Sequence, residues 1–150
     1  MVAHLTQGGL IARGTARMLL SMGFAPITEF VPTRGLRADI CALGPAGEIW
    51  IVECKSGPAD FRADRKWSGY RAWCDRFFWA VDADFPLGLL PQDSGLIRAD
   101  AWGAEILRAA PEQKLAAARR RAMILRFARK GAERLRQMID PEADKLYAGG

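Results

Sequence analysis

Apolar residues recur along the chain with two different periods, and the change of period separates predicted helices from predicted strands. Over residues 9–22, Ile11, Met18 and Met22 fall at helical spacing, and Gly23 follows where a helix commonly ends. This pattern predicts a first helix over residues 9–22.

Strand-like segments follow the first helix. Residues 25–31, 36–43 and 49–55 carry the short apolar stretches typical of strands. The turn sequence GPAG separates the second and third segments, which predicts that they form an antiparallel hairpin.

The second half of the chain alternates between helical and strand patterns. Aromatic residues at near-helical spacing, with Pro58 near the start, predict a helix over residues 58–76. A long helical pattern over residues 114–139 ends before Pro141. The remaining predicted elements are a short strand opening 77–86, a pair of strands at 95–100 and 104–109, and a tail at 140–150.

This order of elements predicts one α/β domain over residues 1–150, with a mixed central β-sheet flanked by helices. Half of the residues are hydrophobic and 26% are charged, the composition of an ordinary soluble domain. No apolar run approaches the roughly 20 residues that span a bilayer, and the N-terminus lacks the features of a signal peptide. We therefore expect a cytoplasmic protein with no membrane partner.

The cysteine and histidine content argues against disulfides and zinc. Cys41, Cys54 and Cys74 cannot all pair within one chain and lack CxxC spacing, so we expect buried, reduced thiols. His4 is the single histidine, which leaves no recognisable set of zinc ligands.

Positive charge is concentrated in the last predicted helix. The formal net charge is +5, and residues 114–136 hold nine Lys or Arg residues against Glu133 alone. Such a segment can serve as the solvated face of a packed helix, or lie on an anionic membrane, but its lack of balancing acids favours contact with DNA phosphates. The DNA contacts expected on it are Arg119, Arg120, Arg121 and Arg126.

Two opposite charges stand at the end of the strand 49–55. Because alternate residues of a strand share a face, Glu53 and Lys55 lie on the same side. If the hairpin loop spans five residues, 44–48, Asp39 lies directly opposite Glu53. A four-residue loop would place Asp39 opposite Val52 and separate the two carboxylates.

Adjacent carboxylates favour a bound cation, because two ionised carboxyl groups repel each other. Mg²⁺ is commonly held by one or two carboxylates together with water and phosphate oxygens, and it stabilises charge that develops on a phosphate. Lys55 could orient the attacking water or neutralise the transition state. Asp39, Glu53 and Lys55 are therefore candidate catalytic residues for phosphodiester hydrolysis; the alternative is a structural ion pair.

An acidic residue on one strand, ExK on the next and a helix after it resemble the PD-(D/E)XK nuclease superfamily. The resemblance implies that Asp39 and Glu53 bind Mg²⁺, or Mn²⁺ in its place. It also implies that the backbone carbonyl of Cys54 is a further ligand and that Lys55 is the catalytic lysine. The proline of the signature is absent, since Ala38 precedes Asp39.

Further site residues are expected around this motif. Many members of the superfamily carry a polar residue and a tyrosine on the following helix, where this chain has Lys66 and Tyr70, so both are candidate DNA contacts. Arg34 and Arg37, in the sequence PTRGLR, are candidate phosphate contacts near the metal. Glu29 on the first strand is the candidate for a third carboxylate ligand.

The amino-acid sequence also resembles that of a narrower family, the MmcB DNA repair proteins of α-proteobacteria. The resemblance is carried by RADICALGPAGEIWIVECKSGPADFRADRKWSGY (37–70) and RRRAMILRFAR (119–129) and extends roughly from Gly9 to Arg136. It implies a restriction-endonuclease-like fold and a damage-inducible, nucleoid-associated protein that acts on DNA beside other repair proteins.

Three functions remain open at this point. The first is a Mg²⁺-dependent DNA endonuclease, for which a homodimer is one expected assembly because cleavage of two strands usually needs two copies of such a site. The second is a catalytically inactive DNA-binding adaptor of a repair complex. The third is a structural protein whose charged pair only closes the edge of the sheet.

Overall fold

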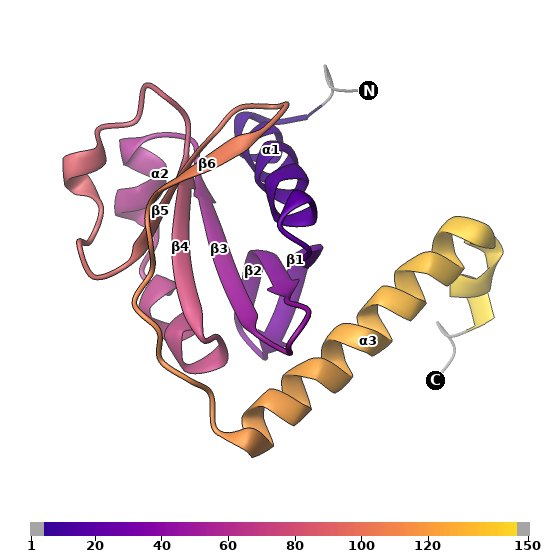
Figure 1. The fold of residues 1–150 in the computed structure, drawn as a ribbon. Helices are drawn as coiled ribbons and strands as arrows, with labels where there is room; N and C mark the ends of the chain where they lie inside the picture. The colour runs from indigo at the N-terminus through magenta and orange to yellow at the C-terminus, as the bar shows by residue number, and fades with distance from the viewer. Residues whose placement is uncertain (1–4, 147–150) are drawn as a thin grey trace.

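The structure is a computed structural model that describes residues 5–146; residues 1–4, which include His4, and residues 147–150 at the end of the predicted tail lie outside the described part. A six-stranded mixed β-sheet forms the middle of the molecule, and helices cover both of its faces (Figure 1). The predicted class, α/β with a mixed central sheet flanked by helices, is confirmed.

The strands lie in the sheet in the order of the chain, from β1 to β6. The pairs β1–β2, β2–β3 and β5–β6 are antiparallel, whereas β3–β4 and β4–β5 are parallel. The predicted hairpin and the predicted pair near residue 100 are therefore both present. The strands are Ala25–Thr33, Leu36–Leu43, Ile49–Lys55, Arg76–Val81, Gly95–Ala99 and Ala104–Arg108.

Helix α1 (Gln7–Ser21) covers one face of the sheet and confirms the helix predicted over residues 9–22. The Thr6 hydroxyl caps it by accepting a hydrogen bond from the Gly9 N–H at 3.0 Å. Just beyond the helix, Gly23 adopts a φ of 85°, a left-handed conformation that glycine allows at little cost.

The opposite face of the sheet is covered by α2 (Pro58–Ala63), the 3₁₀ helix η2 (Trp67–Trp73) and the first half of the last helix. The fully buried Trp79 of β4 is the centre of this layer. Its ring lies 5.2 Å from Phe61 of α2, 5.3 Å from Trp67 of η2 and 5.1 Å from Phe77, measured between ring centroids. The aromatic residues that suggested a helix are thus core residues.

The continuous helix predicted over residues 58–76 is wrong, because the chain turns at Asp64. The Asp64 carboxylate accepts hydrogen bonds from the N–H groups of Lys66 at 2.8 Å and Trp67 at 3.1 Å. This side-chain cap competes with helical hydrogen bonding and starts η2 in a new direction. Residue 76 already belongs to β4.

Helix α3 (Ala117–Ile139) begins at Ala117 rather than at residue 114. The N–H groups of Gln113 and Leu115 donate to the backbone and side chain of Asp75 at 2.8 and 2.9 Å, so these residues are held outside the helix. The C-terminal end of α3 extends beyond the edge of the sheet (Figure 1). Two further 3₁₀ helices are η3 (Leu87–Leu89) and η4 (Pro141–Leu146).

Two expectations from composition concern the cysteines and the membrane. All three cysteines are buried free thiols, and burial raises the pKa of each. Within residues 5–146, no helix is both long enough and apolar enough to cross a membrane.

Candidate active site

The sheet forks where Asp39 and Glu53 face each other. Strands β2 and β3 pair from Leu43–Ile49 to Ile40–Val52, the register of the five-residue loop. Beyond that point β2 continues beside β1, with Ala38 opposite Phe30, while β3 continues beside β4 as far as Lys55 opposite Val81. The two charged strand segments therefore border an opening in the sheet.

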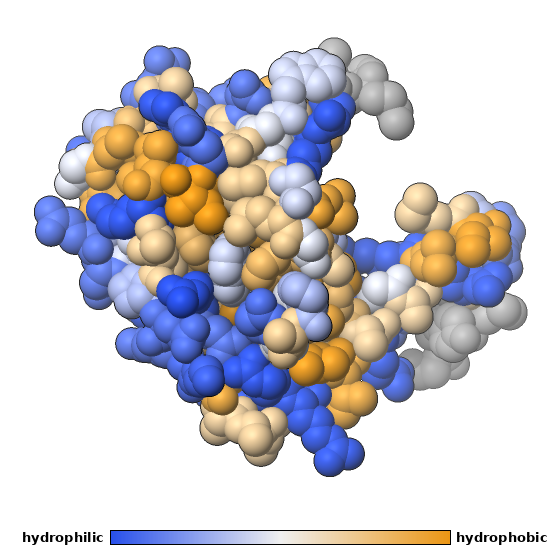
Figure 2. All heavy atoms as spheres, in the orientation of Figure 1, coloured by the Kyte–Doolittle hydropathy of each residue, from blue (hydrophilic) through white to orange (hydrophobic). Residues whose placement is uncertain are grey.

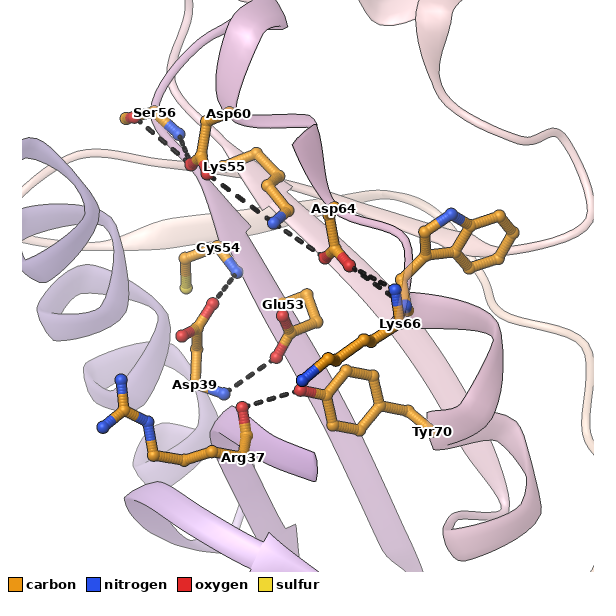
Figure 3. A network of polar contacts seen from close by, with 11 residues as sticks. Arg37, Asp39, Glu53, Cys54, Lys55, Ser56, Asp60, Asp64, Lys66 and Tyr70 are labelled. Carbon is orange, nitrogen blue, oxygen red and sulfur yellow. Dashed lines mark hydrogen bonds and ion pairs between the residues drawn. The ribbon is translucent and has the colours of Figure 1, made fainter. Parts of the chain in front are cut away.

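Side chains hydrogen-bond the backbone groups that the parting strands leave unpaired (Figure 3). The Asp39 N–H donates to Oε1 of Glu53 at 2.9 Å, and the Cys54 N–H donates to Oδ2 of Asp39 at 2.7 Å. The Tyr70 hydroxyl donates to the carbonyl of Arg37 at 2.7 Å. Both carboxylates are thereby fixed in position by the opposite strand.

Burial of these carboxylates opposes their ionisation. Glu53 is 5% exposed, and burial, with a further contribution from the charge of Asp39, raises the pKa of Glu53 to about 8. Burial also raises the pKa of Asp39, although its hydrogen bond from Cys54 works in the opposite direction. Without a cation, the pair therefore retains a proton at neutral pH.

Lys55 lies on the same side of β3 as Glu53. It is paired with Asp60 in α2 and with Asp64, the residue that follows α2. Its Nζ is 2.8 Å from Oδ2 of Asp64 and 3.7 Å from Oδ1 of Asp60. Burial disfavours the charged ammonium, but Asp64 and Asp60 together raise the pKa of Lys55 above its usual value. Figure 3 shows the amino group directed toward Asp64. Lys55 is therefore a charged lysine held by an ion pair.

A hollow of about 710 Å³ opens beside these residues, between the start of α1, β1 and the fork. Asp39, Glu53, Cys54 and Lys55 line it, and Arg13 of α1 lines it from the other side. The space gives a ligand access to the two carboxylates.

The oxygen donors at the fork fit a hard divalent cation. Mg²⁺ accepts one or two carboxylates, with water or phosphate completing its shell, and a cation beside Glu53 would favour its ionised form, which burial disfavours. Asp39, Glu53 and the carbonyl of Cys54 are the groups available to hold such an ion.

Glu29 lines the same hollow but does not complete a cluster of three acidic ligands. In residues 5–146, no three His, Cys, Asp or Glu side chains are grouped closely enough to hold a metal ion. Glu29 has a φ of 51°, next to an irregularity in the β1–β2 register, so the regular alternation of side chains does not apply to it. The third-ligand role expected for Glu29 is not supported.

The candidate DNA contacts near the fork divide into surface and buried residues. Arg34, Arg37 and Lys66 are exposed, and Nζ of Lys66 is 3.5 Å from the carbonyl of Gly35, so all three lie around the β1–β2 turn. Tyr70 is 4% exposed, and its hydroxyl is bound to Arg37. The DNA-contact role expected for Tyr70 is corrected to a structural one.

Three of the four arginines expected to contact DNA from α3 are engaged with the protein. Arg120 forms a two-point ion pair with Asp75, at 2.7 and 2.6 Å. Because its guanidinium is already occupied, the DNA-contact role expected for Arg120 is corrected to a structural one. Arg119 donates to the carbonyl of Ala72 and lies 4.3 Å from the ring centre of Trp73.

The remaining two arginines of this group differ from each other. Arg126 donates to the carbonyl of Pro32 at 2.7 Å, yet its side chain is largely exposed. Arg121 is exposed, and no hydrogen bond or ion pair joins its guanidinium to a described residue. Arg121 is therefore the arginine of this set whose guanidinium is fully available.

Sequence reasoning missed Asp64, Asp60 and Asp75. The one signal for Asp64 is its position three residues before Trp67, a spacing typical of an aspartate that caps a helical turn. Nothing in the sequence pairs Asp75 with Arg120, since 45 residues separate them. Both ion pairs depend on how distant segments pack.

Comparison with known proteins places the chain in a family. A solved structure, described as the SPO1766 protein of unknown function from Silicibacter pomeroyi, is 59% identical over 93% of this chain and 95% of that chain, with a TM-score of 0.91. No protein with curated annotation matches. The family described as DNA repair protein MmcB-like matches residues 5–142. The chain therefore belongs to the MmcB-like family of DNA repair proteins.

Proposed function

We propose that this protein is a metal-dependent nuclease that hydrolyses phosphodiester bonds of DNA during repair. The observation that carries the proposal is the pair of carboxylates of Asp39 and Glu53, fixed opposite each other at an open hollow that Lys55, on the same side of β3 as Glu53, also lines. Membership of a DNA repair family supports DNA as the substrate.

The proposed chemistry assigns a task to each group. Asp39, Glu53 and the Cys54 carbonyl would hold Mg²⁺ or Mn²⁺, which when bound supplies charge stabilisation and a more acidic water. The Lys55 ammonium would stabilise negative charge on the scissile phosphate. Arg34, Arg37 and Lys66, exposed around the neighbouring turn, would hold the DNA backbone.

A cleavage assay tests this proposal. Purified protein is incubated with branched, damaged and single-stranded DNA in Mg²⁺, Mn²⁺ or a chelator. We expect cleavage only with metal, and a loss of at least 100-fold, roughly the contribution of one charged group to such a transition state, in Lys55→Ala. Lys145→Ala, which changes an exposed lysine of η4, is the matched control and should cut like the wild type. Equal activity in wild type and Lys55→Ala would refute the proposal.

A second function, a DNA-binding adaptor with an inactive site, is favoured by the ion pair between Lys55 and Asp64. A lysine held at 2.8 Å from a carboxylate is partly neutralised and less available to a phosphate. The adaptor predicts salt-dependent DNA binding and no metal-dependent cutting by the wild type or by Asp64→Asn. If Asp64→Asn instead cuts faster than the wild type, the pair restrains an active site.

A further inference from the structure

One face of α3 carries an apolar stripe that the fold does not use. The stripe, here termed the outer seam, consists of Leu125, Ala128, Ala132, Leu135 and Ile139. Its members are separated by three, four, three and four residues, the spacing with which one helix packs against another in a coiled coil. All five are exposed, and Leu125, Leu135 and Ile139 are 57, 57 and 62% exposed.

The inward face of α3 consists of different residues. Met123 is buried, and Ile124 and Phe127 are packed against the core layer that contains η2. Arg134 donates to the carbonyls of Thr28 and Glu29 in β1. The outer seam therefore lies beside the contact that attaches α3 to the sheet and is not part of it. Figure 2 shows hydrophobic atoms gathered at the far end of α3.

The outer seam is continuous with a hollow at its N-terminal end. This hollow has a volume of about 720 Å³ and lies between α3, the start of β3 and the segment before α3. Trp50, Leu115, Ile124 and Leu125 contribute its apolar lining. Leu125 belongs to both surfaces, so the seam and the hollow form one apolar track, of which the seam alone spans roughly 21 Å at 1.5 Å per residue.

The charges beside the outer seam are positive and unneutralised. Arg121 precedes Leu125 by one turn, and Arg129 and Arg136 flank the seam along one side. No hydrogen bond or ion pair joins the guanidinium group of any of the three to a described residue, whereas the side chains of Arg120, Lys130 and Arg134 of the same helix are engaged. The outer seam, apolar along its centre and basic along its border, complements an apolar surface with acidic borders. The adjoining hollow is lined by both signs of charge, including Glu48 and Glu112, so the charge complementarity belongs to the seam.

Other occupants fit this surface less well. DNA would leave Leu125, Leu135 and Ile139 without an apolar partner, because phosphate contacts need only the basic groups. A membrane-binding face is typically rich in large Trp, Phe or Leu side chains, whereas the seam has alanine at two of its five positions. A second copy packed antiparallel would bring Arg129 of one chain toward Arg136 of the other.

We propose that the outer seam and its adjoining hollow bind an amphipathic helix of another protein, one with an apolar a/d stripe and acidic residues at its borders. The two alanines let the partner helix approach closely at the middle of the seam. Larger apolar side chains bind at its two ends, and Arg121, Arg129 and Arg136 pair with the partner's carboxylates. The site is distinct from the fork of the sheet and does not depend on nuclease activity.

The experiment uses the full chain and a fluorescein-labelled synthetic peptide of three heptads with Leu at positions a and d and Glu at e and g. The glutamates repel in a peptide dimer, so the peptide remains available as a monomer. Fluorescence anisotropy measures its binding to the wild type and to the double variant Leu135→Ser, Ile139→Ser. We expect at least a tenfold loss of affinity in the double variant.

Matched variants separate the seam from general effects. Met138→Ser changes an apolar side chain of α3 that is 82% exposed but does not belong to the outer seam. This variant should bind the peptide like the wild type. Arg129→Gln with Arg136→Gln should weaken binding and reduce its salt dependence. Because every altered side chain is exposed, all variants should melt at the wild-type temperature.

Defined outcomes would overturn the proposal. Equal affinity of wild type and double variant, or no binding of the acidic peptide by the wild type, removes the site. A lysine-flanked peptide that binds as tightly as the glutamate peptide removes the charge argument. The double variant is also compared with the wild type in binding to anionic vesicles, in binding to a DNA duplex and in self-association by sedimentation. If it loses one of these activities while peptide binding is unchanged, the seam binds that occupant instead.

Discussion

A hydrogen bond joins Asp39 to Glu53 across the point where β2 and β3 part. The Glu53 carboxylate accepts the N–H of Asp39, and the Asp39 carboxylate accepts the N–H of Cys54, the residue after Glu53. Only one oxygen of each carboxylate takes part. The protein thus positions both acids by its own backbone, which lowers the reorganisation that the proposed cation binding would require.

The buried Glu53 carboxyl predicts a pH dependence of stability. Its pKa in the folded protein is about 8, against an ordinary value of 4.5. Between these values the folded state holds a proton that the unfolded chain has released, so the free energy of unfolding falls as pH rises. We expect a slope of up to about 1.4 kcal/mol per pH unit, measured by urea unfolding in a chelator between pH 5 and 8.

The variant Glu53→Gln is the control for this slope, since it keeps an oxygen for the Asp39 N–H but cannot ionise. It should flatten the curve over this range. The lowered pKa of Asp64 and the raised pKa of Lys55 act below and above this range and do not contribute to it. Asp39, whose pKa burial also raises, adds a slope of the same sign at the acidic end of the range, and Glu53→Gln keeps that part. A slope that persists in Glu53→Gln beyond that end would assign the proton to another group.

The ion pair of Arg120 and Asp75 predicts that two neighbouring arginines of α3 differ in their contribution to stability. Asp75 is 5% exposed, so Arg120→Met leaves a buried carboxylate without its cation. We expect a loss of about 3 kcal/mol in the free energy of unfolding. Arg121→Met, which alters an exposed arginine, should change it by less than about 0.5 kcal/mol. Equal effects of the two substitutions in chemical denaturation would contradict the structural role of Arg120.

The hydroxyl of Tyr70 predicts a loss of stability without a loss of DNA affinity. Tyr70→Phe keeps the ring that stacks on Phe77 and removes the hydrogen bond to the Arg37 carbonyl. Thermal unfolding should show a loss of about 1 kcal/mol, while DNA affinity, measured by anisotropy, stays at the wild-type value. Unchanged stability together with weakened DNA binding would restore the DNA-contact role.

Two helical glycines predict opposite effects of the same substitution. A Cβ at Gly14 of α1 would stand 1.8 Å from the carbonyl oxygen of Asp100, so Gly14→Ala should cost at least about 3 kcal/mol. A Cβ at Gly131 of α3 would lie 3.6 Å from Ile27, an ordinary contact, so Gly131→Ala should raise stability by up to about 1 kcal/mol. Melting temperatures of the two variants check both signs, and a stable Gly14→Ala protein would rule out the close packing of α1 on the β5–β6 turn.

Local patterns in the sequence predicted most elements because they depend on near neighbours. The alternation in β3 placed Glu53 and Lys55 on one face, and GPAG predicted the hairpin. The prediction of one helix over residues 58–76 was wrong because the aromatic spacing continues past Asp64, whose carboxylate caps a new turn. Tyr70 was misassigned because burial cannot be seen in spacing alone.

By itself the sequence determined the order of helices and strands, the identity of the charged triad and the excess of positive charge in α3. It left two registers open for Asp39 and Glu53. Only the tertiary structure decided between them, parted the strands at that point, paired Lys55 with Asp64 and Arg120 with Asp75, and left the outer seam exposed. The physical reason is range: turns and periodicity act over a few residues, whereas burial and ion pairs depend on segments that meet only when the chain packs.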